Sequence, residues 1–229
     1  MARVQKIDNA DLKRFAKSSV KRKAREVKIF FLIVCEGEKT EPNYFEKFKG
    51  QFGNVIFEID CEGKGYNTLR VVEEAIKIRD KNPNKYNRVW AVFDKDSFPE
   101  NDFNSAIQKA KSTDIGCAWS NEAFELWYLL HFQYRNTSMS REDYKKSIEN
   151  EVNKKTSGFV YVKNSTEMYD ILQKYGNQAQ AIKNAEKLSK QYENRNFASH
   201  NPRTQVYELV KQLIGQDEEL SKEIKQRFE

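Results

Sequence analysis

Three acidic residues follow directly after two apolar segments, and they are the strongest candidates for chemistry in this sequence. Glu36 follows the apolar run 30–35 (FFLIVC), and Asp94 and Asp96 follow the run 89–93 (VWAVF). Short apolar runs of this kind predict strands that are buried on both faces, and in open α/β sheets ligands bind beyond the carboxyl ends of the strands. If the two strands are neighbours, the three carboxylates face one crevice.

A crevice of this composition predicts a site for a hard divalent cation. Carboxylates without counter-charges repel each other at a sheet edge, and Mg²⁺ or Mn²⁺ relieves that repulsion because these ions prefer oxygen ligands. A bound cation can polarise a phosphodiester, position a water molecule and neutralise charge on the leaving oxygen. An Asp-x-Asp pair alone also occurs in solvated surface turns, so the metal prediction depends on the strand-Glu-Gly segment as well.

Several charged residues near these acids are candidates for supporting roles. Lys39 and Lys95 are candidates for contacting a substrate phosphate, and Lys95 has the alternative role of moderating repulsion between the aspartates that flank it. Glu38 and Glu41 are candidates for additional metal ligands. For Glu41 we favour a place in the first turn of a helix predicted over 41–50, where the helix dipole stabilises an acid.

Segment 121–132 carries two polar residues, Glu125 and His131, in an otherwise apolar pattern. Apolar residues on nearly every side predict a buried helix. A buried ionised carboxylate is costly unless it is paired or bound to a metal. Glu125 therefore either reaches the metal crevice or makes a structural hydrogen bond or ion pair, and both alternatives stay open. For His131 we favour a structural hydrogen bond over work as a general base.

The order of apolar and polar segments predicts the elements that position these residues. Strands are expected at 29–35, 55–60, 88–94 and 115–119, and helices at 41–50, 67–82, 101–112 and 121–132. This alternation predicts an α/β fold with a mainly parallel sheet flanked by helices, over a core domain of residues 28–134. For residues 135–229 we predict a C-terminal helical elaboration packed on the core, with helices at 140–154, 166–175, 177–194, 205–215 and 217–228.

The positive charge of the chain is concentrated at its N-terminus. Residues 1–28 contain ten Lys and Arg against three acids, a net charge of +7, so the remaining 201 residues carry −1 of the overall +6. We therefore predict that residues 1–27 form a basic, flexible arm. The arm either tracks a nucleic-acid backbone or serves as a solubilising or partner-docking extension, and the sequence does not decide between these roles.

Composition argues against several classes of protein. No apolar run exceeds about seven residues, far fewer than a membrane span needs, and the N-terminus has no signal-peptide pattern. Three cysteines without Cys-x-x-Cys spacing and only two histidines argue against structural zinc and for reduced thiols in a cytoplasmic protein. The glycine-containing segment 61–68 lacks the spacing of a phosphate-binding P-loop, so ATP binding by this chain is not expected.

The motifs together resemble a known family. An apolar strand ending in Glu-Gly, followed by a second strand and Asp-x-Asp, resembles the Toprim catalytic domain of topoisomerases, primases and some nucleases. Segments 34–41 (VCEGEKTE), 120–132 (SNEAFELWYLLHF) and 201–206 (NPRTQV) narrow the resemblance to the RloB-like family. The resemblance covers approximately residues 28–215, and four segments in this order are far more specific than any one of them.

The resemblance implies a Toprim-like (Rossmannoid) fold and a prokaryotic protein of anti-phage, abortive-infection defence that works with an RloA-like, ABC-type ATPase. It implies that Glu36 serves in metal coordination or acid/base chemistry, that Asp94 and Asp96 hold Mg²⁺, and that Arg203 returns near the site, where it could hold a phosphate. The nucleophilic tyrosine of topoisomerases has no identifiable counterpart here. Hydrolysis of RNA, such as tRNA, or of DNA is therefore expected rather than strand passage.

Three functions of different classes remain open at this point. The chain is a metal-dependent nuclease, a phosphoryl-transfer enzyme acting on nucleotides, or a non-catalytic regulatory subunit that binds nucleic acid or the ATPase. Retention of Glu36, Asp94 and Asp96 favours the first two. A homo-oligomer is compatible with each of them.

Overall fold

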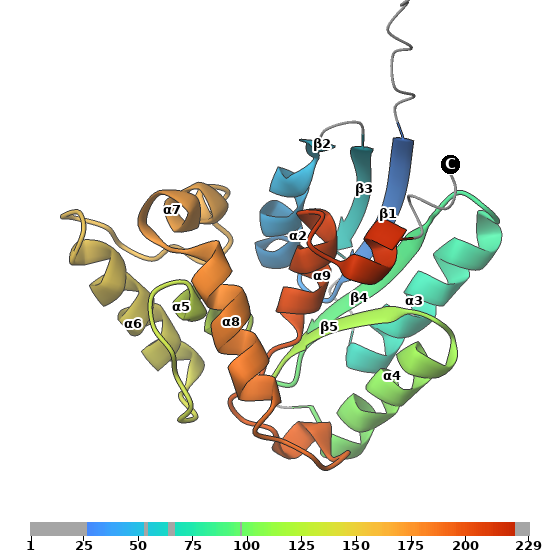
Figure 1. The fold of residues 1–229 in the computed structure, drawn as a ribbon. Coiled ribbons are helices and arrows are strands. Elements are labelled where there is room, and N and C mark those ends of the chain that lie inside the picture. Colours follow the sequence, from blue (N-terminus) through green and yellow to red (C-terminus); the bar gives the residue numbers. More distant parts are fainter. Residues whose placement is uncertain (1–26, 53–54, 64–66, 97, 223–229) are drawn as a thin grey trace, which may run out of the picture.

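The computed structural model describes residues 27–52, 55–63, 67–96 and 98–222, which form a central sheet flanked by helices (Figure 1). The basic arm predicted over 1–27 lies outside the described residues except for Val27. The last predicted helix lies partly outside them as well, and residues 218–222 of that segment are helical.

The sheet has five strands in the order β2-β3-β1-β4-β5. Strands β1 (Val27–Cys35), β3 (Val55–Gly63), β4 (Arg88–Asp94) and β5 (Gly116–Ser120) run parallel. This confirms the predicted α/β class with a mainly parallel sheet, and the arrangement is consistent with a Rossmannoid fold. Strand β2 (Gly50–Phe52) pairs antiparallel with β3 at the edge. It was not predicted, because three residues are too few to show a strand pattern.

The helices alternate with the strands in the first half of the chain and follow one another in the second. They are α2 (Thr40–Phe45), α3 (Thr68–Lys81), α4 (Glu100–Ser112), α5 (Glu125–Leu130), α6 (Arg141–Asn153), α7 (Met168–Tyr175), α8 (Gln178–Ser189) and α9 (Val206–Leu213). Two short 3₁₀ turns, Glu46–Phe48 and Phe197–Ser199, follow α2 and α8. Side chains of Asn67, Ser140 and Asn177 cap α3, α6 and α8 by accepting a backbone N–H.

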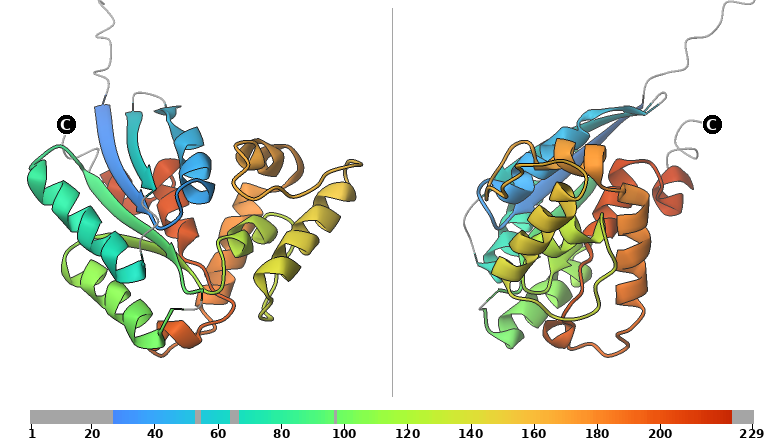
Figure 2. Two further views of the ribbon diagram at one scale, coloured as in Figure 1. Left: turned by 180° about the vertical axis from the view of Figure 1, so that it is seen from behind. Right: turned by 90° about the vertical axis from the view of Figure 1, so that its left-hand side faces the viewer.

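Both faces of the sheet are covered, which explains the continuous apolar runs in the sequence. Alternate residues of β1 belong to different cores: Leu32 and Val34 pack with α3 and α4, whereas Phe31 and Ile33 pack on the opposite face. Figures 1 and 2 show α3 and α4 on one side of the sheet and α2 and α9 on the other. A strand between two helical layers exposes neither row of side chains, so both rows are apolar.

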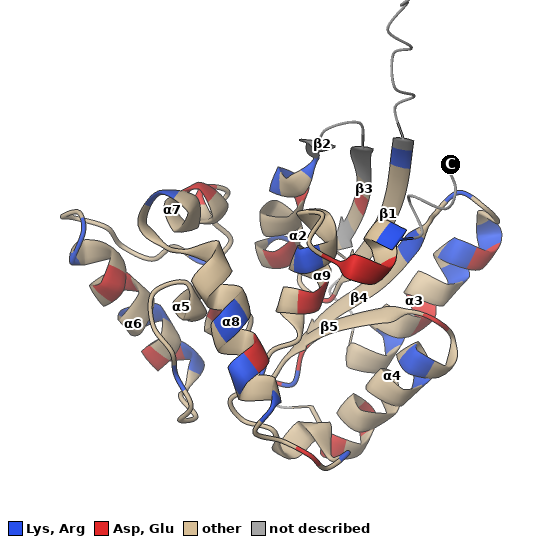
Figure 3. Cartoon of the chain, in the orientation of Figure 1, with Lys and Arg blue, Asp and Glu red and all other residues tan. Residues whose placement is uncertain are grey.

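The second half of the chain joins the core on the face that carries α2. Buried residues of α6, α7, α8 and α9 belong to the same hydrophobic cluster as β1 and α5. The indole Nε1 of Trp90 in β4 donates to Gln212 Oε1 of α9 at 3.1 Å. Lys and Arg alternate with Asp and Glu on the outer helices (Figure 3), for example in the Lys145–Glu142 pair at 2.6 Å. These helices are solvated outside and apolar inside, as in a surface layer of a globular domain.

Three predicted helices are shorter than the sequence pattern suggested. The helix predicted over 177–194 ends at Ser189. The helix predicted over 41–50 ends at Phe45 and gives way to a 3₁₀ turn and β2. The helix predicted over 121–132 begins at Glu125, since Glu122 has a positive φ of 73° and the Phe124 N–H donates to Asp94 Oδ2. The Phe124 N–H thus contacts the end of β4, while the carbonyls of Ala123 and Phe124 accept from Leu126 and Trp127 at the start of the helix.

The chain reverses its direction across the sheet between β1 and β4. After β1 it moves to β3 on one side, then returns past β1 to form β4 on the other side. The carboxyl ends of β1 and β4 lie next to each other at this reversal, with Cys35 paired to Val92. Open α/β sheets bind their ligands at such a point. None of the helices in the described residues is long and apolar enough to cross a membrane.

Candidate functional site

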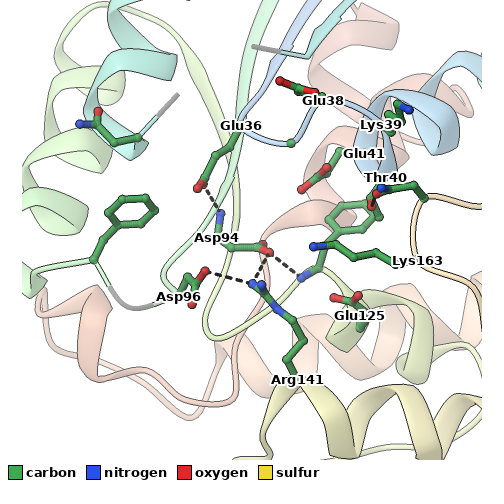
Figure 4. Close-up of a pocket in the computed structure, with 15 residues that line it drawn as sticks. Glu36, Glu38, Lys39, Thr40, Glu41, Asp94, Asp96, Glu125, Arg141 and Lys163 are labelled. Atoms are coloured by element: carbon green, nitrogen blue, oxygen red, sulfur yellow. Dashed lines mark hydrogen bonds and ion pairs between the residues drawn. The ribbon is translucent and has the colours of Figure 1, made fainter. Parts of the chain in front are cut away.

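A cavity of about 650 Å³ lies at the carboxyl ends of β1 and β4 (Figure 4). Its walls come from both halves of the chain: the loop after β1 and the start of α2, the end of β4, the start of α5, the first residue of α6 and the segment after α6. The lining residues are Glu36, Gly37, Glu38, Lys39, Thr40, Glu41, Asn67, Asp94, Asp96, Phe98, Phe124, Glu125, Arg141, Lys163 and Asn164. The structure thus brings together all three acids that sequence analysis placed at one crevice.

Glu36 is held against the end of β4 by backbone hydrogen bonds. Its N–H donates to Val92 O at 2.9 Å, and its carboxylate Oε2 accepts the N–H of Asp94 at 3.1 Å. Burial raises the pKa of Glu36 to about 7, although the Asp94 N–H acts in the opposite direction. Glu36 can therefore gain or lose a proton near neutral pH.

Asp94 is the last residue of β4 and is 9% exposed. Its Oδ2 accepts the Phe124 N–H at 3.0 Å and lies 3.7 Å from Nη2 of Arg141. Burial raises its pKa well above the ordinary value, and the charges of Glu41, Glu125 and Glu36 add to that rise. The protein thus holds Asp94 rigidly, in surroundings that disfavour its charge in the absence of a cation.

Asp96 and Arg141 face each other across the opening of the cavity. Asp96 has a φ of 40°, in the left-handed region that few non-glycine residues adopt, and its Oδ2 lies 3.5 Å from Arg141 Nη2. Arg141 stands in the first turn of α6, and the same Nη2 also approaches Glu122 O at 3.4 Å. One guanidinium nitrogen therefore stands between the two aspartates (Figure 4).

Glu41 lies in the first turn of α2, as predicted, but it also belongs to the cavity. It is 6% exposed, and its Oε2 has no hydrogen-bond partner in the described part of the chain. Burial, followed by the charge of Glu125, raises its pKa to about 7. Its carboxylate packs over Gly37, where a Cβ atom would overlap it. The glycine after Glu36 is needed for this close approach.

Glu125 satisfies both alternatives that its sequence position left open. It lines the cavity, and it is 3% exposed at the start of α5. Its Oε1 accepts a hydrogen bond from the hydroxyl of Tyr161 at 3.0 Å. A buried carboxylate thus reaches the cavity while a structural donor holds it in place.

The three predicted phosphate-binding residues have different positions. Lys39 lines the cavity, whereas Lys95 does not, and its Nζ lies 3.5 Å from Asp96 O. Arg203 does not line the cavity either. Its Nη1 donates to Nδ1 of His200 at 2.8 Å, and its guanidinium lies over the Trp119 ring at 5.2 Å. The position of Arg203 gives no support for a phosphate contact at this site.

His131 lies at the end of α5, away from the cavity lining. Its Nδ1 is 3.0 Å from Trp127 O, four residues earlier, and it is 2% exposed. Burial lowers its pKa to about 4, so the ring is neutral at physiological pH. This position agrees with the structural interpretation that we favoured.

Sequence analysis missed Arg141 and Lys163 altogether. Both come from the helical half, in segments that have no motif of their own, and they reach the cavity only through the packing of α6 and α7 on the core. Glu41 was not missed, because its position shortly after Glu36 had made it a candidate for an additional ligand.

The side chains of the cavity are of the type that binds a hard divalent cation, although they are not arranged around a common point as metal ligands. Six carboxylates line it as potential oxygen ligands, Glu38 among them, and the Oε2 of Glu41 has no hydrogen-bond partner in the described residues. Within the residues that the structure describes, no three acidic, histidine or cysteine side chains already stand close enough to hold one ion. Arg141 supplies the positive charge between Asp94 and Asp96 instead.

Comparison with protein families identifies the chain. The model of the family described as RloB-like protein matches residues 31–213. The chain belongs to the RloB-like family. Every residue that lines the cavity of this RloB-like protein lies inside the matched range. No curated protein and no solved structure matches the chain.

Proposed function

We propose that this RloB-like protein is a metal-dependent nuclease of the Toprim type. Its substrate is RNA, such as tRNA, or DNA, in which it hydrolyses phosphodiesters. One observation carries the proposal: Glu36, after β1, and the Asp94/Asp96 pair, at the end of β4, meet in one cavity where the chain reverses across the sheet. Glu36 and Asp94 are 58 residues apart in the sequence. Acids on adjacent strand ends at that position suit phosphoryl chemistry better than a structural role.

Glu36, Asp94 and Asp96 are the proposed ligands for Mg²⁺ or Mn²⁺, with Glu41 and Glu125 beside them. When bound, the cation would polarise the phosphodiester and neutralise charge on the leaving oxygen. The high pKa values of Glu36, Glu41 and Asp94 support this assignment, because carboxylates buried together favour any cation that restores their charge balance.

Proton transfer is the second role proposed for Glu36. This role is the alternative to coordination: if the cation is held by the other acids, the Glu36 carboxyl group, whose pKa in the metal-free site is about 7, can accept a proton from an attacking water and return it to the leaving oxygen. The Asp94 N–H fixes one carboxylate oxygen, so the other is available to the substrate side. Arg141 can stabilise negative charge on the phosphate, since a guanidinium remains protonated at any relevant pH.

Family membership supports the biological part of the proposal. We propose that the protein acts in anti-phage, abortive-infection defence in the cytoplasm, together with an RloA-like, ABC-type ATPase that restrains or directs it. The basic N-terminal arm is then available to either the ATPase or the nucleic acid. A cavity of about 650 Å³ also supports a second candidate, phosphoryl transfer on free nucleotides, because it lies within the usual size of small-ligand pockets.

The decisive experiment is a cleavage assay on pooled tRNA, single-stranded RNA, plasmid DNA and free nucleotides with Mg²⁺ or Mn²⁺, with and without the ATPase. Asp94→Ala/Asp96→Ala should abolish turnover, and Asp80→Asn, on the exposed end of α3, should leave it unchanged. Polymer cleavage that the double substitution abolishes supports the nuclease. Turnover of nucleotides alone favours the second candidate. If no substrate is altered while the ATPase still binds, the chain is a regulatory subunit.

A further inference from the structure

Residues 155–166, which we call the strap, connect α6 to α7 along the side of the cavity. Side chains 159–162 alternate in direction: Phe159 and Tyr161 pack against the core, and Tyr161 donates to Glu125, whereas Val160 and Val162 are 68% and 62% exposed. This alternation shows an extended segment. A turn follows at residues 163–164, where Lys163 lines the cavity while its side chain stays accessible to solvent.

The strap is fastened at both ends by side chains. Asn153 of α6 makes two hydrogen bonds to the backbone of Phe159, accepting its N–H at 2.9 Å and donating to its carbonyl at 2.8 Å. At the other end, Asn164 accepts the hydroxyl of Thr40 at 2.6 Å, and its carbonyl accepts from Asn43 at 3.0 Å. These bonds tie the strap to α2, so its inward side chains are positioned before any ligand binds.

Lys163 is directed into the cavity (Figure 4), yet its ammonium makes no hydrogen bond or ion pair within residues 27–52, 55–63, 67–96 and 98–222. Arg141 is only partly used, because all its contacts in the same residues involve Nη2. A guanidinium has five N–H donors and an ammonium has three. The cavity therefore presents spare cationic donors near its buried acids.

We infer that Lys163 and Arg141 form the phosphate-binding subsite of the proposed nuclease, and that this site accepts an unpaired strand and rejects an intact double helix. The inference rests on the proposed function and names its substrate class. A phosphate bound here would contact a cation held by the acids on one side of the cavity and the two basic side chains on the other. Oxygen atoms on a phosphate suit such a divided site, because each can accept from a different donor.

The size of the cavity supplies the preference for an unpaired strand. A cavity of about 650 Å³ lies in the size range of pockets that enclose a small ligand, so it has room for about one nucleotide, whereas the major groove of a duplex alone is about 12 Å wide. Asp94 and Glu41, 9% and 6% exposed, must approach the phosphate closely. We therefore expect one extruded nucleotide to enter the cavity and an intact duplex to be excluded from it. Phe98, which also lines the cavity, offers a ring for the base.

The test measures binding apart from cleavage. Fluorescein-labelled single strands of RNA and DNA of about ten nucleotides, and blunt-ended duplexes of the same strands with their complements, are titrated with full-length protein in Ca²⁺ by fluorescence anisotropy. Lys163→Gln should weaken single-strand binding about tenfold and lower the salt slope by about 0.7, the value for one phosphate contact. Lys163→Arg should restore binding. Val162→Gln, on the outer face of the strap, is the matched control.

Each outcome decides the inference. The inference is supported if Lys163→Gln binds the single strand more weakly than wild type, Val162→Gln and Lys163→Arg do not, and wild type binds the duplex at least tenfold more weakly than the single strand. Equal binding of single strand and duplex overturns it, and so does wild-type binding by Lys163→Gln. Absence of binding to any probe overturns it as well. If binding follows the expectation while no substrate is cleaved in the separate turnover assay, the subsite stands and the nuclease proposal fails.

Discussion

Two clusters of titratable side chains are buried in this protein, and the fold treats them in opposite ways. The acidic cluster consists of Glu36, Glu41, Asp94, Asp96 and Glu125. Within the described residues its only ion pairs are those of Asp94 and Asp96 with Arg141. The second, which we call the His200 cluster, joins His200 to Arg203, Asn194, Tyr192 and Trp119.

The His200 cluster is built for stability. His200 is fully buried: its Nδ1 accepts from Arg203 at 2.8 Å, its other nitrogen lies 2.9 Å from Asn194 Oδ1, and its ring stacks on Tyr192 at 4.5 Å. Burial and the neighbouring Arg203 lower the pKa of His200 to about 4, which keeps the ring neutral. In the acidic cluster burial raises the pKa values of Glu36, Glu41 and Asp94, and Glu41 Oε2 has no hydrogen-bond partner in the described residues. The His200 cluster also keeps one donor without a partner, Arg203 Nε, but its histidine is neutral and adds no like charge beside the guanidinium. The acidic cluster instead gathers like charges, which a bound cation would balance, so it is the better candidate for a ligand site.

The largest expected effect separates activity from stability. Asp94→Asn should lower kcat at least about 100-fold, because it removes a ligand and a charge, without lowering Tm. His200→Ala should do the reverse: it leaves the Arg203 donor unpaired and should cost about 2–3 kcal/mol of unfolding free energy, while kcat per folded molecule stays within about twofold. Chemical denaturation and single-turnover cleavage measure the two quantities.

A His200→Ala protein that is stable but inactive would contradict this division, and so would an Asp94→Asn protein that is active but unstable. Either result would move the functional site toward the His200 cluster and revive the phosphate role predicted for Arg203. Asp80→Asn serves as the control for surface charge, because its carboxylate is largely exposed.

Divalent cations should stabilise the folded protein, and only by binding at the acidic cluster. At pH 8, Mg²⁺ or Mn²⁺ at 100 times its Kd should raise the unfolding free energy by about 2.7 kcal/mol. The gain should disappear in Asp94→Ala/Asp96→Ala and persist in His200→Ala. Thermal unfolding with and without EDTA measures it. An equal gain in the double variant would show that the cation binds elsewhere.

The two clusters should also give stability opposite dependences on pH. The folded-state pKa of Glu36 and Glu41, about 7, exceeds the ordinary value of 4.5, so their contribution is present below pH 4.5 and is lost as pH rises through 7. The folded-state pKa of His200, and of buried His131, is about 4 against an ordinary 6.5. Their contribution is present above pH 6.5 and is lost as pH falls through 4.

Single substitutions isolate each side of this profile. In EDTA, Glu41→Gln should raise the unfolding free energy at pH 8 by on the order of 2 kcal/mol and flatten the loss between pH 5 and pH 8. His200→Asn should instead reduce the loss on the acid side. Urea unfolding at a series of pH values provides the measurement. Parallel profiles for wild type and Glu41→Gln would show that Glu41 ionises freely.

The acidic residues of the site could be predicted because their positions follow from a local rule. Glu36 and Asp94 end apolar strands, and parallel strands place their carboxyl ends together. The parallel sheet and most helix positions followed from the same patterning. Arg141 and Lys163 could not be predicted this way, since they reach the cavity through packing between helices, which leaves no periodic signal in the chain.

Other differences arise where tertiary contacts override local preference. The apolar segment 121–132 begins its helix only at Glu125, because Asp94 takes the Phe124 N–H. Arg203 looked free to bind a phosphate, but His200 and Trp119 occupy its guanidinium. Asp94 lies 30 residues before Phe124, and Trp119 is more distant still from Arg203. His200 is only three residues before Arg203, but the contact between them depends on how the backbone folds there. A pattern within one segment therefore does not reveal these contacts.

The smallest expected effect concerns Glu125, which combines features of both clusters. It lines the acidic cavity, yet it has a side-chain donor, Tyr161, as groups of the His200 cluster do. Tyr161→Phe removes that donor and should lower the unfolding free energy by about 1 kcal/mol, because the carboxylate loses one hydrogen bond but can still contact a cation. Cleavage should fall only a few fold, through less exact placement of Glu125 and of the strap that carries Lys163. Glu125→Gln distinguishes the two roles: a loss as large as that of Asp94→Asn makes Glu125 a ligand, whereas a loss no greater than that of Tyr161→Phe makes it a support.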